Sequence, residues 1–314
     1  MLGHDHDHDH HYDHDHHDPH HHAPATFGAA FAIGASLNTA LVAAQLLYGW
    51  RANSVALLAD AMHNFGDVVA LLLAWGAAIL GRRLPSARRT YGWGRSSILA
   101  ALINAAVLLV SVGAIAVEAI HRLRNPAPVD GATVMMVAAI GIAINGFTAW
   151  LFSRGHDDLN VRAAFLHMAG DAAVSAGVLV AAALIGLTGW LWLDPLTSLV
   201  IVAVIAASSW GVLRQSANLA MDGVPDGIAH ADVEAYLRAL PGITEVHDLH
   251  IWALSTTETA LTAHLVRAEP TDDARVIQDA TGGLAVKFRI RHATLQIETT
   301  DIAAACRLRP AHVV

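Results

Sequence analysis

The feature that most constrains this chain is a series of six apolar runs, each long enough to cross a membrane as a helix. A hydrocarbon core of about 30 Å requires roughly 20 helical residues. Of the 314 residues, 54% are hydrophobic and 15% are charged, a balance too apolar for an ordinary soluble domain. We therefore expect an all-α membrane domain of six transmembrane helices within residues 25–214. The expected spans are approximately Thr26–Trp50, Val55–Leu80, Ser96–His121, Gly131–Ser153, Ala163–Leu187 and Pro195–Leu213.

Arginines are shared unequally between the two sides of this arrangement. The connections after the second and fourth runs are richer in arginine than those after the first and third. Because the arginine-rich side of a membrane protein faces the cytoplasm, both termini are expected there, in a multi-pass protein of the bacterial inner membrane. The arginines on the richer side are Arg82, Arg83, Arg88, Arg89, Arg95, Arg154 and Arg162, against Arg51, Arg122 and Arg124 on the other.

Charge and cysteine content exclude several classes of protein. A formal net charge of −8 argues against nucleic-acid binding. The single cysteine, Cys306, excludes a disulfide framework and a zinc module built on cysteines.

The pattern from about residue 215 to residue 314 is that of a small folded domain outside the membrane. A helix near Ala231–Leu240 is followed by the strand-like segments "VHDLHIWAL" and "TALTAHLV", which a polar turn at Ser255–Glu258 separates. A second helix from Asp272 to about Ala280 is expected to end at Gly282-Gly283, before the strand "ATLQIE". The order αββαβ predicts a cytoplasmic, ferredoxin-like α+β domain. Because so small a domain buries a modest core, we expect it to pair with a second copy.

Residues 1–24 form a third region, in which histidine alternates with aspartate. The stretch "HDHDHDHHYDHDHHDPHHH" contains nothing apolar to fold around, so it is expected to be disordered and to bind metal ions weakly. A purification tag is disfavoured because tags are usually unbroken histidine runs. We interpret the tract as a collector of metal at the entrance of the membrane domain, through His4, His6, His8, His10, His11, His14, His16, His17, His20, His21 and His22.

Two of the apolar runs each contain a histidine followed four residues later by an aspartate. His63 and Asp67 in the second run, like His167 and Asp171 in the fifth, are four residues apart and therefore lie on one face of a helix. An ionisable group at bilayer depth costs several kcal/mol. Two histidines and two aspartates from facing helices are a ligand set that tetrahedral Zn²⁺ accepts. The repeated pair thus predicts an intramembrane metal site.

Charge favours the same interpretation. Two carboxylates and two neutral imidazoles sum to −2, so a divalent ion neutralises the group, and in its absence protons compete for the same atoms. A hydrogen bond between helices would explain one isolated polar residue but not two identical pairs. Asp60 lies close to the same helix face and is left open: it could orient a ligand, relay protons or cap internal structure.

These motifs resemble those of the cation diffusion facilitator family, in its bacterial zinc/cadmium/cobalt resistance-type branch. The segments "NSVALLADAMHNFGDV", "YGWGRSSILAALINA", "LNVRAAFLHMAGDAAVS" and "LDPLTSL" match family signatures in order and spacing. The resemblance implies a homodimeric secondary transporter, not an enzyme, that exports Zn²⁺, or in some members Cd²⁺ or Co²⁺, in exchange for protons. It implies His63, Asp67, His167 and Asp171 as the transport site.

In the C-terminal domain the resemblance implies a regulatory metal site at His247, His264 and Glu298. Regular strand alternation would instead turn His250 toward the polar face, so His250 stays a candidate. The segment between Leu265 and Arg291 holds no histidine, which argues against a binuclear cluster there.

The combined expectation is a transporter with Zn²⁺ as substrate and regulatory ligand, no organic cofactor, and H⁺, the bilayer and a second copy as partners. An intramembrane metallohydrolase would need an open position on its metal ion for water or substrate. Here the two His/Asp pairs would fill all four tetrahedral positions. A membrane-bound metal sensor without transport is the alternative, but it has no need of ligands at mid-membrane depth.

Overall fold

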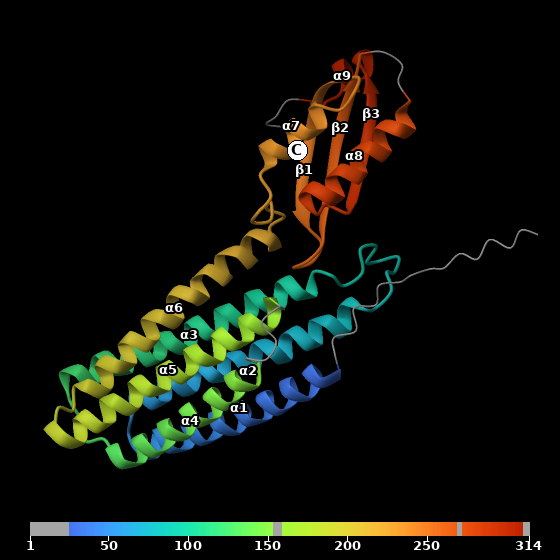
Figure 1. Ribbon diagram of the computed structural model, residues 1–314. Helices are drawn as coiled ribbons and strands as arrows, with labels where there is room; N and C mark the ends of the chain where they lie inside the picture. The colour runs from blue at the N-terminus through green and yellow to red at the C-terminus, as the bar shows by residue number, and fades with distance from the viewer. Residues whose placement is uncertain (1–24, 153–158, 269–271, 310–314) are drawn as a thin grey trace, which may run out of the picture.

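A computed structural model shows six long helices followed by a small α+β domain (Figure 1). The structure describes residues 25–152, 159–268 and 272–309, so the expected His/Asp-rich tract lies outside the described residues. Five of the described helices, α2 to α6, are long and apolar enough to span a membrane, and α1 adds a sixth of 27 residues. The bounds are α1 Ala25–Arg51, α2 Val55–Gly81, α3 Ser96–Arg124, α4 Gly131–Phe152, α5 Leu159–Thr188 and α6 Leu193–Ala220.

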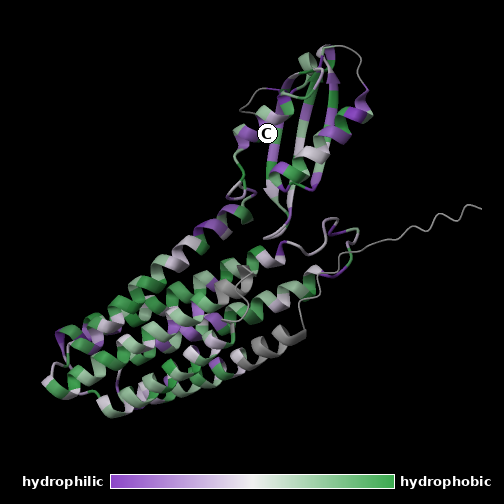
Figure 2. Cartoon of the chain, viewed as in Figure 1, coloured by the Kyte–Doolittle hydropathy of each residue, from purple (hydrophilic) through white to green (hydrophobic). Residues whose placement is uncertain are grey.

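Hydropathy separates the two regions of the molecule. Figure 2 shows the long helices as mainly apolar, with hydrophilic positions interrupting them inside the bundle, whereas apolar and polar residues are mixed in the C-terminal domain. The predicted six-helix membrane domain with an α+β domain at its C-terminus is confirmed.

Helix α2 packs against α1, α3, α5 and α6 and is therefore central to the bundle. Gly66 permits the close approach of α3, because a Cβ atom at this position would lie 2.7 Å from Leu108 Cδ1. The position next to Asp67 is thus fixed by contact between the two helices.

The starts of α2 and α6 are tied together by one carboxylate. Asp194, at 2% exposure, accepts hydrogen bonds from Ser54 Oγ and from the backbone N–H groups of Val55, at 2.7 Å, and Ala56, at 3.4 Å. Ser54 Oγ in turn accepts from Leu57 N. A negative charge satisfies the free N–H groups at a helix start, so the residue from the sixth-span motif caps α2.

The C-terminal domain follows the expected order, with one added helix. Its elements are α7 His230–Arg238, β1 Ile243–Ala253, β2 Thr259–Arg267, α8 Asp273–Phe288, β3 His292–Thr299 and α9 Thr300–Ala305. The sheet has the order β1-β2-β3, with β1 and β2 antiparallel and β2 and β3 parallel. Helices α7 and α8 cover one face of the sheet (Figure 1) and contribute to one apolar core with it.

Two expected helix ends are wrong. Helix α8 continues through Gly282-Gly283 to Phe288, because Ala280 and Leu284 are both fully buried and keep the helix on the sheet through the glycines. It ends where Arg289 adopts a left-handed conformation with φ 59°. Helix α6 continues beyond the expected end at Leu213 to Ala220, because its last turns keep a buried face that includes Leu219.

The membrane domain contacts the C-terminal domain through the segment between α2 and α3 and the start of α3. Ile98, Leu219 and Ala253 form a small apolar cluster across this junction. Arg95 pairs with Asp222, and Ser97 Oγ accepts a hydrogen bond of 3.1 Å from Thr256 N. The junction thus joins α3, the end of α6 and the β1–β2 hairpin.

Candidate metal sites

The structure brings the four intramembrane candidates together between α2 and α5. His63 Nε2 lies 3.1 Å from Asp171 Oδ1, and His167 Nε2 lies 3.3 Å from Asp67 Oδ2 and 3.8 Å from Asp171 Oδ2. Ligands about 2.0–2.2 Å from a tetrahedral Zn²⁺ are roughly 3.3–3.6 Å from one another. In this membrane quartet, donor atoms of His63, Asp67 and Asp171 all lie within 4.8 Å of one another, and His167 approaches both carboxylates.

Exposure differs within the membrane quartet. The Asp171 side chain is 2% exposed, whereas the His167 side chain is 44% exposed. A cavity of about 240 Å³ reaches Asp67 and His167 and is lined also by Asn38 and Thr148. One side of the quartet is thus accessible, while Asp171 forms its closed side.

Asp60 belongs to a polar network next to the quartet. It is fully buried, and its Oδ2 accepts hydrogen bonds from Gln45 Nε2 at 2.6 Å and Ser175 Oγ at 2.9 Å. Gln45 Oε1 accepts from Asn64 Nδ2 at 3.1 Å. Asp60 lies one turn from His63 and Ser175 one turn from Asp171, so the network links both ligand-bearing helices. Asp60 thus lies beside the quartet, and its role as an orienting group, a proton relay or a structural cap stays a prediction.

Gln45 and Ser175 were not among the residues predicted from the sequence. Ser175 extends the spacing of His167 and Asp171 by one further turn, and Gln45 is a polar residue in the first apolar run. Both signals were present, but a serine or glutamine in a span is usually a contact between helices. Only their hydrogen bonds to Asp60 on α2 identify Gln45 and Ser175 as parts of this network.

The three candidates of the C-terminal domain also come together. His264 Nδ1 is 3.0 Å from Glu298 Oε1, and His247 Nε2 is 3.4 Å from Glu298 Oε2. The rings of His247 and His264 meet edge to face with centroids 5.0 Å apart. Cys306 Sγ joins them, 3.8 Å from His264 Nδ1. These four residues, from β1, β2, β3 and the end of α9, form the C-terminal cluster.

His247 and His250 lie on either side of a β-bulge in β1. Asp248 has φ 51°, and the register shifts between His247, which pairs with His264, and His250, which pairs with Thr262. Because His264 and Thr262 are two residues apart on β2, the extra residue puts His247 and His250 on the same face of the sheet, and His247 lies buried beside Glu298. His250 instead lies 2.9 Å from Asp248 Oδ1 and stays outside the C-terminal cluster.

Several polar atoms of the C-terminal cluster are buried without a hydrogen-bond partner among the described residues. Two hydrogen bonds from Arg309 engage both carboxylate oxygens of Glu245 and lower the pKa of its carboxyl below the ordinary 4.5. Within the described part of the chain, both ring nitrogens of His247 and Glu298 Oε2 are buried without a hydrogen bond. Buried polar atoms of this kind carry an energetic penalty, which a bound cation would offset.

Cys306 was missed as a candidate because one cysteine without a CxxC partner carries little signal. The short helix α9, which the sequence analysis did not anticipate, returns the chain to the sheet and places the thiol beside His264. Two imidazoles, one carboxylate and one thiolate are a donor set that fits Zn²⁺ or Cd²⁺.

Comparison with known proteins covers both regions. Residues 31–219 match the cation efflux transmembrane domain and residues 225–300 match the cation efflux protein cytoplasmic domain. Zinc transporter ZitB of Escherichia coli K12 is 36% identical over 271 residues, covering 85% of this chain and 86% of the relative. The cation efflux system protein CzcD of Alcaligenes sp. is 34% identical over 298 residues, covering 94% and 90%.

A third relative carries an ion exchange in its name. The cadmium, cobalt and zinc/H⁺-K⁺ antiporter of Bacillus subtilis strain 168 is 34% identical over 264 residues, covering 81% of this chain and 84% of the relative.

Proposed function

We propose that this chain, which belongs to the cation efflux family of metal transporters, the cation diffusion facilitators, exports Zn²⁺ from the cytoplasm in exchange for protons. The membrane quartet is the proposed transport site. The observation that carries this proposal is that donor atoms of His63, Asp67 and Asp171 lie within 4.8 Å of one another inside the helix bundle, with His167 beside both carboxylates.

The donor set supports zinc as the substrate. Two imidazole nitrogens and two carboxylate oxygens suit Zn²⁺ better than Mg²⁺ or Ca²⁺, which prefer oxygen alone. Cd²⁺ and Co²⁺ are accepted by similar ligands, and the names of the relatives include both metals. We therefore propose Zn²⁺ as the main substrate, with Cd²⁺ and Co²⁺ as possible further ones.

Proton exchange follows from the same atoms. Metal binding requires neutral imidazoles and ionised carboxylates, so an ion that enters releases protons and protons that enter release the ion. The partly exposed side of the site at His167 and the cavity beside it provide a route for exchange. Alternating access to the two membrane faces would convert this competition into antiport.

The C-terminal cluster is proposed as a regulatory metal site. His247, His264 and Glu298 would hold the ion, with Cys306 as a fourth donor. We also propose that the transporter is a homodimer with both termini in the cytoplasm of a bacterial inner membrane. Val286 on α8 and Ile302 on α9 are 84% and 56% exposed, and such apolar side chains support association of the C-terminal domain with a second copy.

Metal uptake by sealed proteoliposomes tests the transport proposal. An imposed pH gradient should drive Zn²⁺ into the vesicles and a protonophore should stop it, with Cd²⁺ and Co²⁺ compared under the same gradient. Zinc binding without flux would contradict the proposal and favour a membrane-bound sensor. Zinc flux that does not depend on the pH gradient would contradict proton exchange but not zinc transport.

A further inference from the structure

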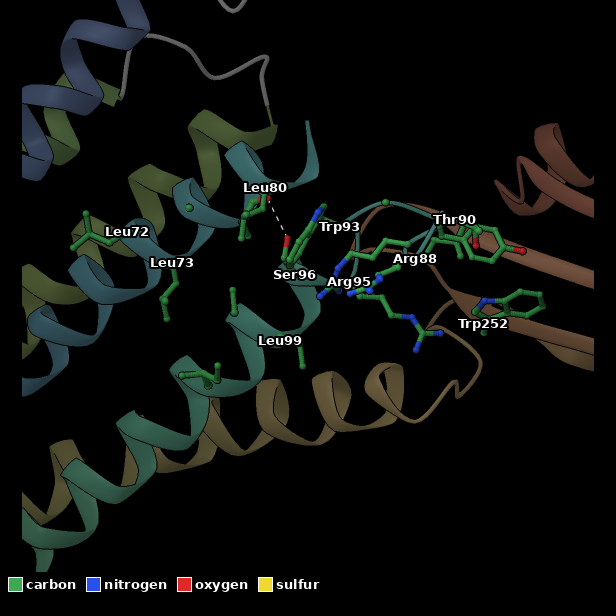
Figure 3. A pocket seen from close by; sticks show the side chains of 18 residues that line it. Leu72, Leu73, Leu80, Arg88, Thr90, Trp93, Arg95, Ser96, Leu99 and Trp252 are labelled. Atoms are coloured by element: carbon green, nitrogen blue, oxygen red, sulfur yellow. Dashed lines mark hydrogen bonds between the residues drawn. The ribbon is translucent and has the colours of Figure 1, made fainter. Parts of the chain in front are cut away.

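A cavity of about 630 Å³ opens between α2, α3 and residues 88–95, away from the proposed transport site (Figure 3). We propose that it binds an anionic phospholipid, with the phosphate at Arg88 and Arg89 and an acyl chain along the groove between α2 and α3. This inference does not depend on which metal the protein carries.

The wall of the cavity within the membrane domain is apolar. Leu72 on α2 and Leu99 and Ile103 on α3 are 60%, 51% and 52% exposed. Gly76 lines the cavity between them, and its missing side chain leaves a groove rather than a ridge. Apolar side chains on spanning helices face hydrocarbon, so the natural occupant of this wall is an acyl chain.

The opposite rim carries positive charge. Arg88 and Arg89 are exposed and follow the end of α2, where lipid headgroups lie. Among the described residues, no carboxylate lies within ion-pair distance of either one. The Arg89 guanidinium is 3.7 Å from the centroid of the Trp93 ring, which holds it at the rim. Arginine binds phosphate through paired N–H groups, and basic pockets between spanning helices suit anionic headgroups.

Both domains border the cavity. Trp252 and Leu254 of the C-terminal domain line it together with the α2–α3 connection, and Figure 3 shows Trp252 across the cavity from Leu72 and Leu73. Arg95 also lines it but is already paired with Asp222. A bound lipid would therefore contact both domains at their junction. A free phosphate has no acyl chain and would leave the apolar wall of the cavity uncovered.

Lipid binding to the purified full-length protein in neutral detergent tests the inference. We expect native mass spectrometry to show phosphatidylglycerol bound about tenfold more tightly than phosphatidylcholine, given two arginines near the headgroup. The double variant Arg88→Gln/Arg89→Gln should lose this preference. The matched control, Arg51→Gln/Arg124→Gln, removes two exposed arginines from the other side of the bundle and should keep it.

A second pair of variants tests the apolar wall independently. Gly76→Leu should fill the groove and weaken phosphatidylglycerol binding severalfold, whereas Gly113→Leu on α3 should not. A Cβ atom added at either glycine meets no atom within 4 Å, so both variants should fold.

Three outcomes would overturn the inference. Equal loss in the Arg51→Gln/Arg124→Gln control would show nonspecific attraction. Displacement of the lipid by glycerol phosphate, with Gly76→Leu unaffected, would show a site for a soluble anion. Weaker dimerisation of Arg88→Gln/Arg89→Gln, with lipid binding unchanged, would show that a second copy covers the groove.

Discussion

The membrane quartet and the C-terminal cluster use similar donors but are built in opposite ways. Each half of the membrane quartet is an i, i+4 pair on one helix, and the pairs meet because α2 and α5 pack together. The C-terminal cluster takes one residue from each of three strands and one from the chain after α9. Its His247 and Glu298 side chains are 4% and 1% exposed, against 44% for His167. An accessible site suits an ion that must pass, and a closed site suits an ion that stays.

The strongest test of this contrast is Asp171→Ala. Asp171 contacts both histidines of the membrane quartet, so its loss should reduce zinc transport at least about a hundredfold, since even supporting partners of metal ligands are worth 10–100-fold. Initial uptake rates in proteoliposomes measure it. His264→Ala in the C-terminal cluster should retain transport at saturating zinc, and equal losses in both variants would remove the proposed division of roles.

The next test separates His247 from His250. We expect His247→Ala to weaken zinc binding by the C-terminal cluster about a hundredfold, and His250→Ala to change it by less than about threefold. Competition with a chelator should be measured in protein that keeps both folded domains, carries Asp171→Ala and lacks residues 4–22, so that the other proposed sites do not bind zinc. A larger effect of His250→Ala would contradict the placement of His247, and not His250, in the C-terminal cluster.

A smaller effect is expected for Cys306→Ser. Loss of a soft thiolate should weaken zinc binding by roughly tenfold and Cd²⁺ binding by more, while uptake at saturating zinc stays unchanged. With Co²⁺ as a probe, the thiolate-to-metal absorption band should disappear. A band that persists in Cys306→Ser would place the sulfur outside the site.

The smallest effect concerns the His/Asp-rich tract, which lies outside the described residues. Deleting residues 4–22 should raise the apparent KM for zinc severalfold and leave the maximal rate intact, because a tethered store increases the local metal concentration. Uptake across a zinc series measures both parameters. A lower maximal rate with the same KM would indicate gating by the tract instead of metal collection.

How much could be predicted from the sequence differs between the two regions for a physical reason. The helix period turns His63 and Asp67 into neighbours without any knowledge of the rest of the fold. The C-terminal cluster depends on strand register, on one extra residue at Asp248 and on the short helix before Cys306. None of these follows from a local period, so alternation alone favoured His250.

Asp60 shows a further limit. Its place close to the face of His63 is readable in the sequence, but its hydrogen bonds to Gln45 and Ser175 come from α1 and α5. Such contacts arise from the packing of three helices, and only the fold selects them among the polar residues of the spans.

The carboxylate of Asp194 has a mechanical consequence. It fastens the first turn of α2 to the first turn of α6, and α6 leads at its far end into the C-terminal domain. The first turns of α2 and α6 are therefore expected to move together. A displacement of α6 would then reach α2, the helix that carries His63 and Asp67, through this carboxylate.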